Sequence, residues 1–124
     1  MVDLKVVAGY FGATGNALIT LDDNDQGWED FVGTLLIYVA EVLMNVSTGG
    51  DLPEFPEVLK KGTTDRISGA FRATLIIANS VLGFAKFQVS GKASVALKYA
   101  NQVLTQLISG QPVTVPIPKV LMNK

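Results

Sequence analysis

The sequence contains no cysteine and no histidine. The chain therefore has no disulfide, no thiol nucleophile, few ways to bind zinc, and no side chain that ordinarily exchanges a proton near neutral pH. Its tyrosines, Tyr10, Tyr38 and Tyr99, are scattered, and no pairing of a base with a nucleophile is visible. We therefore expect no catalytic, cofactor-binding or metal site, and a protein that is not an enzyme.

Charged residues are also scarce. They make up 17% of the 124 residues, whereas 48% are hydrophobic; an average soluble domain has about 25% charged residues. The net charge is −1, and beyond Lys60 and Lys61 there is no basic cluster to neutralise nucleic-acid phosphates. The length suits a single domain, 1–124, with one core. Because so little charge is available to cover its apolar faces, we expect partner subunits or lipid to cover some of them.

Three segments have the apolar spacing of long helices. Residues 28–46 are apolar almost all round, which favours a buried central helix, with a membrane-spanning helix as the alternative. Residues 64–89 and 92–109 each have an apolar stripe at three- and four-residue spacing, and their short connection predicts a helical hairpin. One further helical turn is expected within 56–61. The predicted fold is therefore mainly α, a small helical bundle.

The segment 64–89 is more apolar than a normal surface helix. Its polar side carries Arg72 and Lys86, but Ile76, Phe84 and Phe87 widen the apolar side.

The N-terminal residues 1–21 combine β-branched and aromatic side chains with glycines at positions 9, 12 and 15. This composition favours a β-hairpin that turns at 12–15, and a short, glycine-weakened helix is the alternative. A phosphate-binding turn of a dinucleotide-binding fold would need another glycine where Leu18 stands. Asp3 lies where a secretory signal is basic, so we expect no cleavable signal.

The C-terminal residues 111–124 cannot form one helix, because prolines stand at positions 112, 116 and 118. We expect an extended arm with Val113, Val115 and Ile117 on one side. An apolar arm of this kind must lie on its own domain or on a neighbouring subunit.

The densest charge lies in LDDNDQGWED, residues 21–30, which holds five acidic residues. A calcium loop starting at Asp22 would reach its twelfth position at Gly33, where a bidentate glutamate must close the coordination shell. A catalytic pair of Asp22 with Asp25 or Asp30 would need a pocket that raises one pKa. We interpret the segment as a turn and a helix start, where carboxylates interact favourably with the helix dipole.

Glu41 lies inside the most apolar predicted helix, where burial of an unpaired carboxylate is costly. It therefore lies at a rim, pairs with Arg66, Arg72 or Lys86, or contacts a neighbouring subunit. Arg72 has the same alternatives, solvated face or contact between subunits. We predict that both residues belong to an oligomer interface.

The sequence predicts a non-catalytic, self-associating structural or assembly protein, a homo-oligomer without nucleic-acid partners. Its apolar faces and its C-terminal arm would pack on neighbouring subunits. The interface residues we expect are Glu41, Arg72, Val113, Val115 and Ile117. One alternative is a membrane-active helical protein such as a pore former, and a second is a small-ligand-binding domain.

Overall fold

The computed structural model describes residues 3–21, 27–63, 66–67 and 69–122, which form helices and no strand. Four helices are long: α1 (Leu4–Leu21), α2 (Trp28–Thr48), α4 (Gly69–Ala85) and α5 (Gly91–Ile108). Two are short: α3 (Glu57–Lys61) and α6 (Lys119–Met122). The mainly α class is confirmed, with four long helices where the sequence indicated three. Residues 22–26, which include three acidic residues and the first positions of the calcium-loop hypothesis, lie outside the described residues.

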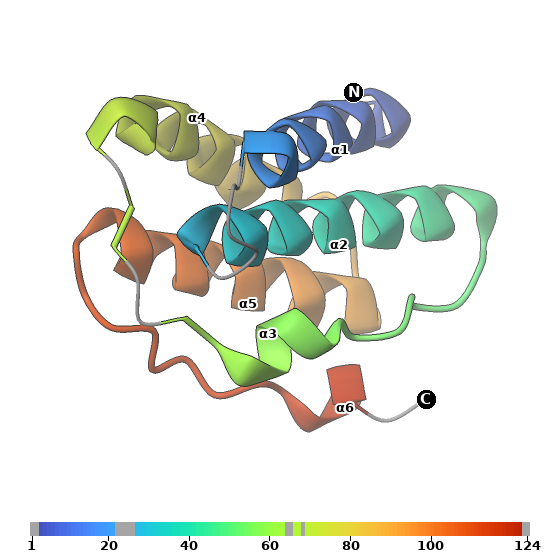
Figure 1. The fold of residues 1–124 in the computed structure, drawn as a ribbon. Coiled ribbons are helices and arrows are strands. Elements are labelled where there is room, and N and C mark those ends of the chain that lie inside the picture. Colours follow the sequence, from blue (N-terminus) through green and yellow to red (C-terminus); the bar gives the residue numbers. More distant parts are fainter. Residues whose placement is uncertain (1–2, 22–26, 64–65, 68, 123–124) are drawn as a thin grey trace.

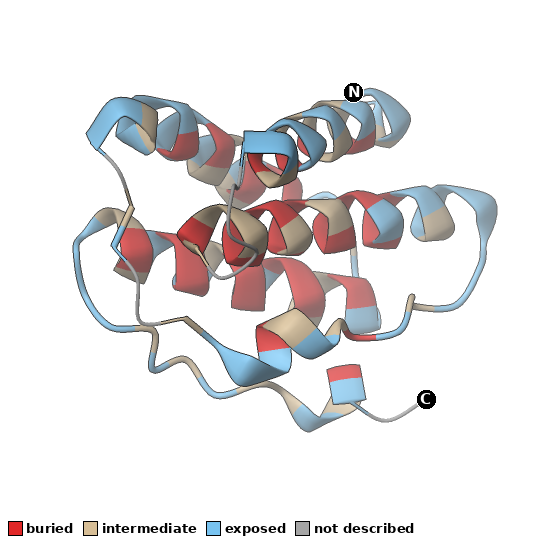
Figure 2. Cartoon of the chain, viewed as in Figure 1, coloured by how far each residue is buried: buried red, intermediate tan, exposed pale blue. Residues whose placement is uncertain are grey.

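The helices are arranged in three layers (Figure 1). α1 and α4 form the upper layer and contact each other, α2 and α5 form the middle layer, and α3, the C-terminal arm and α6 lie below. Figure 2 shows buried residues along the middle layer and on the sides of α1 and α4 that face it. The outer sides of α1 and α4 are exposed.

α2 is the central helix and packs against α1, α3 and α5. Eleven of its 21 residues are buried. Its apolar side chains therefore lie in the protein interior, in agreement with the buried central helix that the sequence favoured. It ends at Gly49, which has a φ of +77° and donates its N–H to the carbonyl oxygens of Asn45 and Val46. Trp28 is buried at the start of the helix, with its ring centroid 5.6 Å from that of Phe71 near the start of α4.

The N-terminal segment is a helix, not the hairpin that its composition favoured. The glycines expected in a turn lie inside α1, and Gly15 is buried directly against Gly33 of α2. A glycine lowers helix propensity, but it also lets two backbones approach closely, and here the packing outweighs the propensity. Residues 12–15 are therefore helical, and they form neither the turn of a β-hairpin nor a phosphate-binding turn.

The predicted hairpin of helices appears as α4 and α5, which pack against each other. α5 agrees with the predicted 92–109 to within one residue, whereas α4 is shorter than the predicted 64–89. The side-chain amide of Asn101 donates to Asn79 Oδ1 at 2.7 Å, and that of Asn79 donates to Thr105 Oγ1 at 3.0 Å. These bonds tie the two helices together along their polar sides.

The connection from α2 to α3 is anchored by Phe55. This side chain is buried, with ring centroids 5.3 Å from Tyr38 of α2 and 5.7 Å from Tyr99 of α5. α3 supplies the helical turn expected within 56–61.

The C-terminal arm lies on its own chain. Residues 111–118 have no regular secondary structure and continue into α6, a turn that the sequence did not predict. The side chains of Val113, Val115 and Ile117 are half-buried against the core. Gln106 of α5 holds the arm: its Oε1 accepts from the backbone N–H of Thr114, and its Nε2 donates to the Thr114 hydroxyl, both at 2.9 Å. The sequence allowed the arm to lie on its own domain or on a neighbouring subunit, and in this structure it lies on its own domain.

Candidate functional site

The strongest candidate site is the exposed outer side of the upper layer. Of the nine large hydrophobic residues that are exposed in the described chain, six belong to α1, to α4 or to the turn that follows α4. They are Val6, Leu21, Ile76, Ile77, Phe84 and Phe87. Exposed large apolar side chains that concentrate on one layer of a domain are typical of interaction surfaces.

The largest exposures lie on and just after α4. Ile77 is 58% exposed, Phe84 54% and Phe87 75%. They are exposed because α4 is apolar on two sides and only one side, with Leu75 and Leu82, faces the core. We call the outer side the α4 face; its residues are Ala70, Ala73, Ile76, Ile77, Ser80, Phe84 and Phe87, all exposed.

Little charge accompanies these side chains. Arg72 is the one charged residue within α4, and it is exposed. Lys86, directly after the helix, is turned to the α5 side: its Nζ donates to Asn101 Oδ1 at 2.8 Å and lies 5.2 Å from the Phe87 ring centroid. α4 contains no acidic residue.

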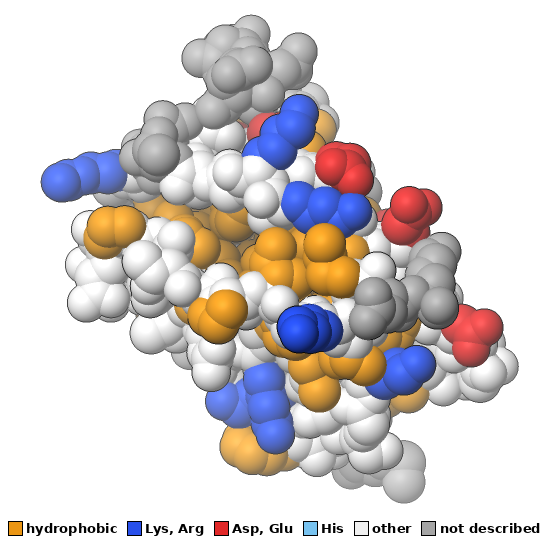
Figure 3. Space-filling view, turned by 90° about the horizontal axis from the view of Figure 1, so that it is seen from below, with side chains coloured by type: hydrophobic (Ala, Val, Ile, Leu, Met, Phe, Trp, Pro, Cys, Tyr) orange, Lys and Arg blue, Asp and Glu red, His pale blue; other side chains and the backbone are white. Residues whose placement is uncertain are grey.

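The lower side of the molecule differs from the α4 face. Figure 3, seen from below, shows hydrophobic side chains interspersed with both basic and acidic ones. Exposed charged residues of this layer include Lys60, Lys61 and Lys119 together with Glu54 and Glu57, and Lys60 pairs with Glu57 at 2.9 Å. Among the described residues, charge is therefore distributed unevenly, and the upper layer has little of it.

The structure does not bring the predicted interface residues together. Arg72 lies on α4 in the upper layer, Glu41 is exposed on α2, and the apolar residues of the arm lie in the lower layer. No ion pair joins Glu41 to Arg66, Arg72 or Lys86 in the part of the chain that the structure describes. Glu41 thus lies at a rim in the single chain, and its contact with another subunit stays a prediction.

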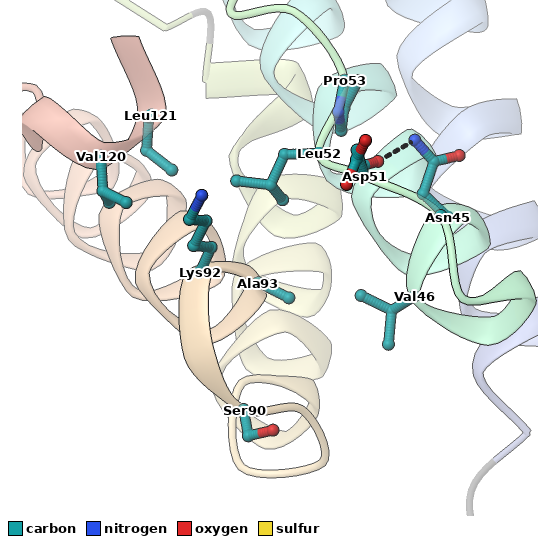
Figure 4. A pocket seen from close by; sticks show the side chains of 11 residues that line it. Asn45, Val46, Asp51, Leu52, Pro53, Ser90, Lys92, Ala93, Val120 and Leu121 are labelled. Atoms are coloured by element: carbon teal, nitrogen blue, oxygen red, sulfur yellow. Dashed lines mark hydrogen bonds between the residues drawn. The ribbon is translucent and has the colours of Figure 1, made fainter. Parts of the chain in front are cut away.

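A hollow of about 490 Å³ lies where the C-terminal end of α2 meets the start of α5 and α6. Lys92 projects into it from the first turn of α5, near Leu52 and Val120 (Figure 4). On the opposite wall the amide of Asn45 donates to the backbone carbonyl of Asp51 at 2.7 Å. The described residues hold no group of three or more potential metal-ligating side chains, and no ion pair joins Asp51 and Lys92, the two charged residues that line the hollow.

Tyr38 is the buried titratable group with the largest shift. Burial raises its pKa to about 12, and the neighbouring Tyr99 and Glu41 add to the effect. Its hydroxyl has no hydrogen-bond partner among the described residues. A phenol with such a pKa stays neutral at physiological pH and is a poor proton donor. We assign Tyr38 to the core.

Comparisons with protein-family models, with curated proteins and with solved structures give no match to this chain. Within the described residues, the α4 face is a large apolar surface that packing of the core does not explain.

Proposed function

We propose that the protein is a non-catalytic helical assembly protein that associates with copies of itself. The observation that carries this proposal is the α4 face, with Ile77, Phe84 and Phe87 each more than half exposed. Covering apolar surface is favourable by about 25 cal/mol per Å². Aromatic side chains contribute much of the binding energy at protein interfaces.

The low charge of the whole chain supports the same proposal. Solubility of a solitary molecule depends on surface charge, yet α4 carries only Arg72. The α4 face would be covered by a neighbouring subunit, whereas the charged side chains of the lower layer stay in water.

Exchange of the C-terminal arm is a second way in which subunits would be joined. The arm follows Gly110, which has a φ of +74°, and it is held on α5 by the pair of bonds from Gln106 to Thr114. A neighbouring subunit offers an identical α5 surface, so the same contacts can form between chains. Such an exchange would give Val113, Val115 and Ile117 the interface role that the sequence predicts.

The α4 face is tested by replacing its aromatic residues. We expect the double variant Phe84→Ser/Phe87→Ser to lower the oligomer mass measured by light scattering after size-exclusion chromatography. The matched control is Met122→Ser, which removes another exposed apolar side chain from α6. An unchanged mass in the double variant, with helical circular dichroism preserved, would overturn the assignment of the α4 face.

Arm exchange is tested with an engineered cysteine pair, because the chain has no cysteine of its own. In the variant Gln106→Cys/Thr114→Cys, oxidation forms a disulfide within one chain if the arm stays on its own domain. If arms are exchanged, the oxidised oligomer runs as a covalent multimer in denaturing, non-reducing electrophoresis. Only intrachain disulfides in an oligomeric sample would remove the arm from the assembly.

A membrane-active protein is the second candidate function. α2 is the one described helix long and apolar enough to cross a membrane, and the α4 face could lie on a bilayer. Flotation with neutral and anionic vesicles, combined with dye release, tests this candidate. Absence of binding to both kinds of vesicle removes it, whereas binding that the Phe84→Ser/Phe87→Ser variant abolishes would favour it over self-association.

A further inference from the structure

We infer that the α4 face is the contact between two copies of this chain, and that the two α4 helices pack antiparallel about a two-fold axis. This inference rests on the proposed self-association through the α4 face, and it adds the orientation and the residue pairing of the two helices. Figure 1 shows α4 at the outer edge of the upper layer, with its neighbours on the inner side.

The exposed residues of α4 follow the spacing of a helix–helix seam. Ala70, Ala73, Ile77, Ser80, Phe84 and Phe87 are separated by three, four, three, four and three residues, and all six are exposed. A repeat of three and four residues places side chains along one line that faces a partner helix. The line extends through Phe87, because Lys86 N donates to Leu82 O at 3.0 Å and Phe87 N donates to Phe84 O at 3.2 Å.

The side chains along this seam change from small to large. Its first two positions are alanines, and its last two are phenylalanines. In an antiparallel pair, Phe87 of one copy faces Ala70 of the other, Phe84 faces Ala73, and Ile77 faces Ser80. Large side chains then meet small ones at both ends, which is how facing helices interdigitate. A parallel pair would place phenylalanine against phenylalanine at one end and leave two facing alanines at the other.

The charge of α4 is compatible with the same orientation. α4 contains Arg72 and no acidic residue, and Lys86 follows it. A parallel pair would bring the two Arg72 side chains to the same level of the seam, where like charges oppose the contact, whereas Lys86 lies on the α5 side and outside the contact. In the antiparallel pair the two Arg72 side chains lie at opposite ends of the seam.

One pair of helices makes a small contact. Interfaces below about 1,200 Å² are typical of reversible complexes, so we expect a dimer whose population rises with protein concentration. The two-fold axis falls between Ile77 and Ser80. Residues near this axis lie close to the same residue of the other copy, and residues far from it do not.

Single-cysteine variants of the full chain test the geometry. Ser80 lies next to the axis, so Ser80→Cys should give a covalent dimer with a short bis-maleimide. Ala70→Cys should not link to itself, because its two copies lie about 17 residues of helix apart, roughly 26 Å at about 1.5 Å per residue. It should link when mixed with Gln88→Cys, which lies at the opposite end of the seam. Gln88 is exposed and outside the seam, so this pair leaves Phe84 and Phe87 in place.

Each result has a distinct meaning. Linking of Ser80→Cys alone, and of Ala70→Cys only with Gln88→Cys, supports the antiparallel seam. Linking of Ala70→Cys to itself as readily as Ser80→Cys overturns the antiparallel orientation. An oligomer by light scattering with no link at any of these positions overturns the seam but leaves self-association standing. A monomer at every concentration overturns both, and vesicle binding by that monomer would point to a lipid surface as the occupant of the α4 face.

Discussion

Gly15 of α1 and Gly33 of α2 contact each other through their backbones. A Cβ atom added to Gly15 would lie 2.6 Å from the carbonyl oxygen of Gly33, and one added to Gly33 would lie 2.7 Å from the carbonyl oxygen of Gly15. Real Cβ atoms essentially never approach other atoms closer than 3.0 Å. The contact holds α1 against the central helix, so the upper layer, with the α4 face beside α1, depends on it.

Gly15→Ala should therefore destabilise the fold. The added methyl group meets backbone atoms of Gly33 and Ile37 that cannot move aside, and such overpacking typically costs about 1–3 kcal/mol. Gly9→Ala is the control in the same helix, because no atom lies within 4 Å of its added Cβ. This control should raise the free energy of unfolding by about 0.5–1 kcal/mol. Urea denaturation measures both, and equal effects would contradict the close crossing of α1 and α2.

Tyr38→Phe should leave the protein as stable as before or more stable. The hydroxyl is buried and has no hydrogen-bond partner in the described chain, so its removal relieves a desolvation cost of roughly 1–3 kcal/mol. The ring itself is needed, because it packs on Phe55; Tyr38→Ala should lose about 3–5 kcal/mol. A loss of more than about 1 kcal/mol in Tyr38→Phe, measured by denaturant unfolding, would show that the hydroxyl has a partner.

Stability should fall at alkaline pH. The pKa of Tyr38 is raised from 10.0 to about 12, so the folded state keeps a proton that the unfolded state releases between these values. The contribution is fully present below pH 10 and is lost as the pH rises through the folded pKa. The loss is on the order of 2–3 kcal/mol for a shift of about two units. Tyr38→Phe should show a smaller decrease in unfolding free energy over this range, and an equal decrease in variant and parent would refute the assignment to Tyr38.

Gln106→Ala should loosen the C-terminal arm. Both bonds to Thr114 are lost, and each contributes about 0.5–1.5 kcal/mol net. Limited proteolysis within 111–118 should therefore become faster while α5 stays protected. Gln102→Ala is the matched control on the same helix, since Gln102 is exposed and its side chain makes no hydrogen bond in the described chain. Equal cleavage rates in the two variants would show that Gln106 does not hold the arm.

Much of the fold follows from local patterns in the sequence. The bounds of α2 and α5 agree with the apolar periodicity, and the single turn α3 follows from the proline and charge pattern of residues 56–61. Periodicity is informative here because the buried stripes are long and continuous. The extended course of residues 111–118 follows from their prolines.

The N-terminal helix was not predictable in the same way. Gly15 weakens a helix considered alone, and its value appears only when Gly33 lies opposite it, 18 residues further along the chain. The contact exists only when α1 and α2 are packed together, so the sequence of α1 alone does not reveal it. The α4 face was partly visible, because Ile76, Phe84 and Phe87 exceed what a surface helix needs. Which of its two apolar sides faces the core depends on the placement of α5, and the sequence alone does not fix that.

The mass of the unmodified chain in native solution tests the central claim most directly. Native mass spectrometry over a range of protein concentrations, with and without detergent, separates monomer, closed oligomer, open polymer and lipid-bound form. Self-association through the exposed apolar side of α4 predicts an oligomer without detergent, whose share grows with concentration. A single copy at every concentration, together with no affinity for bilayers, would contradict the account.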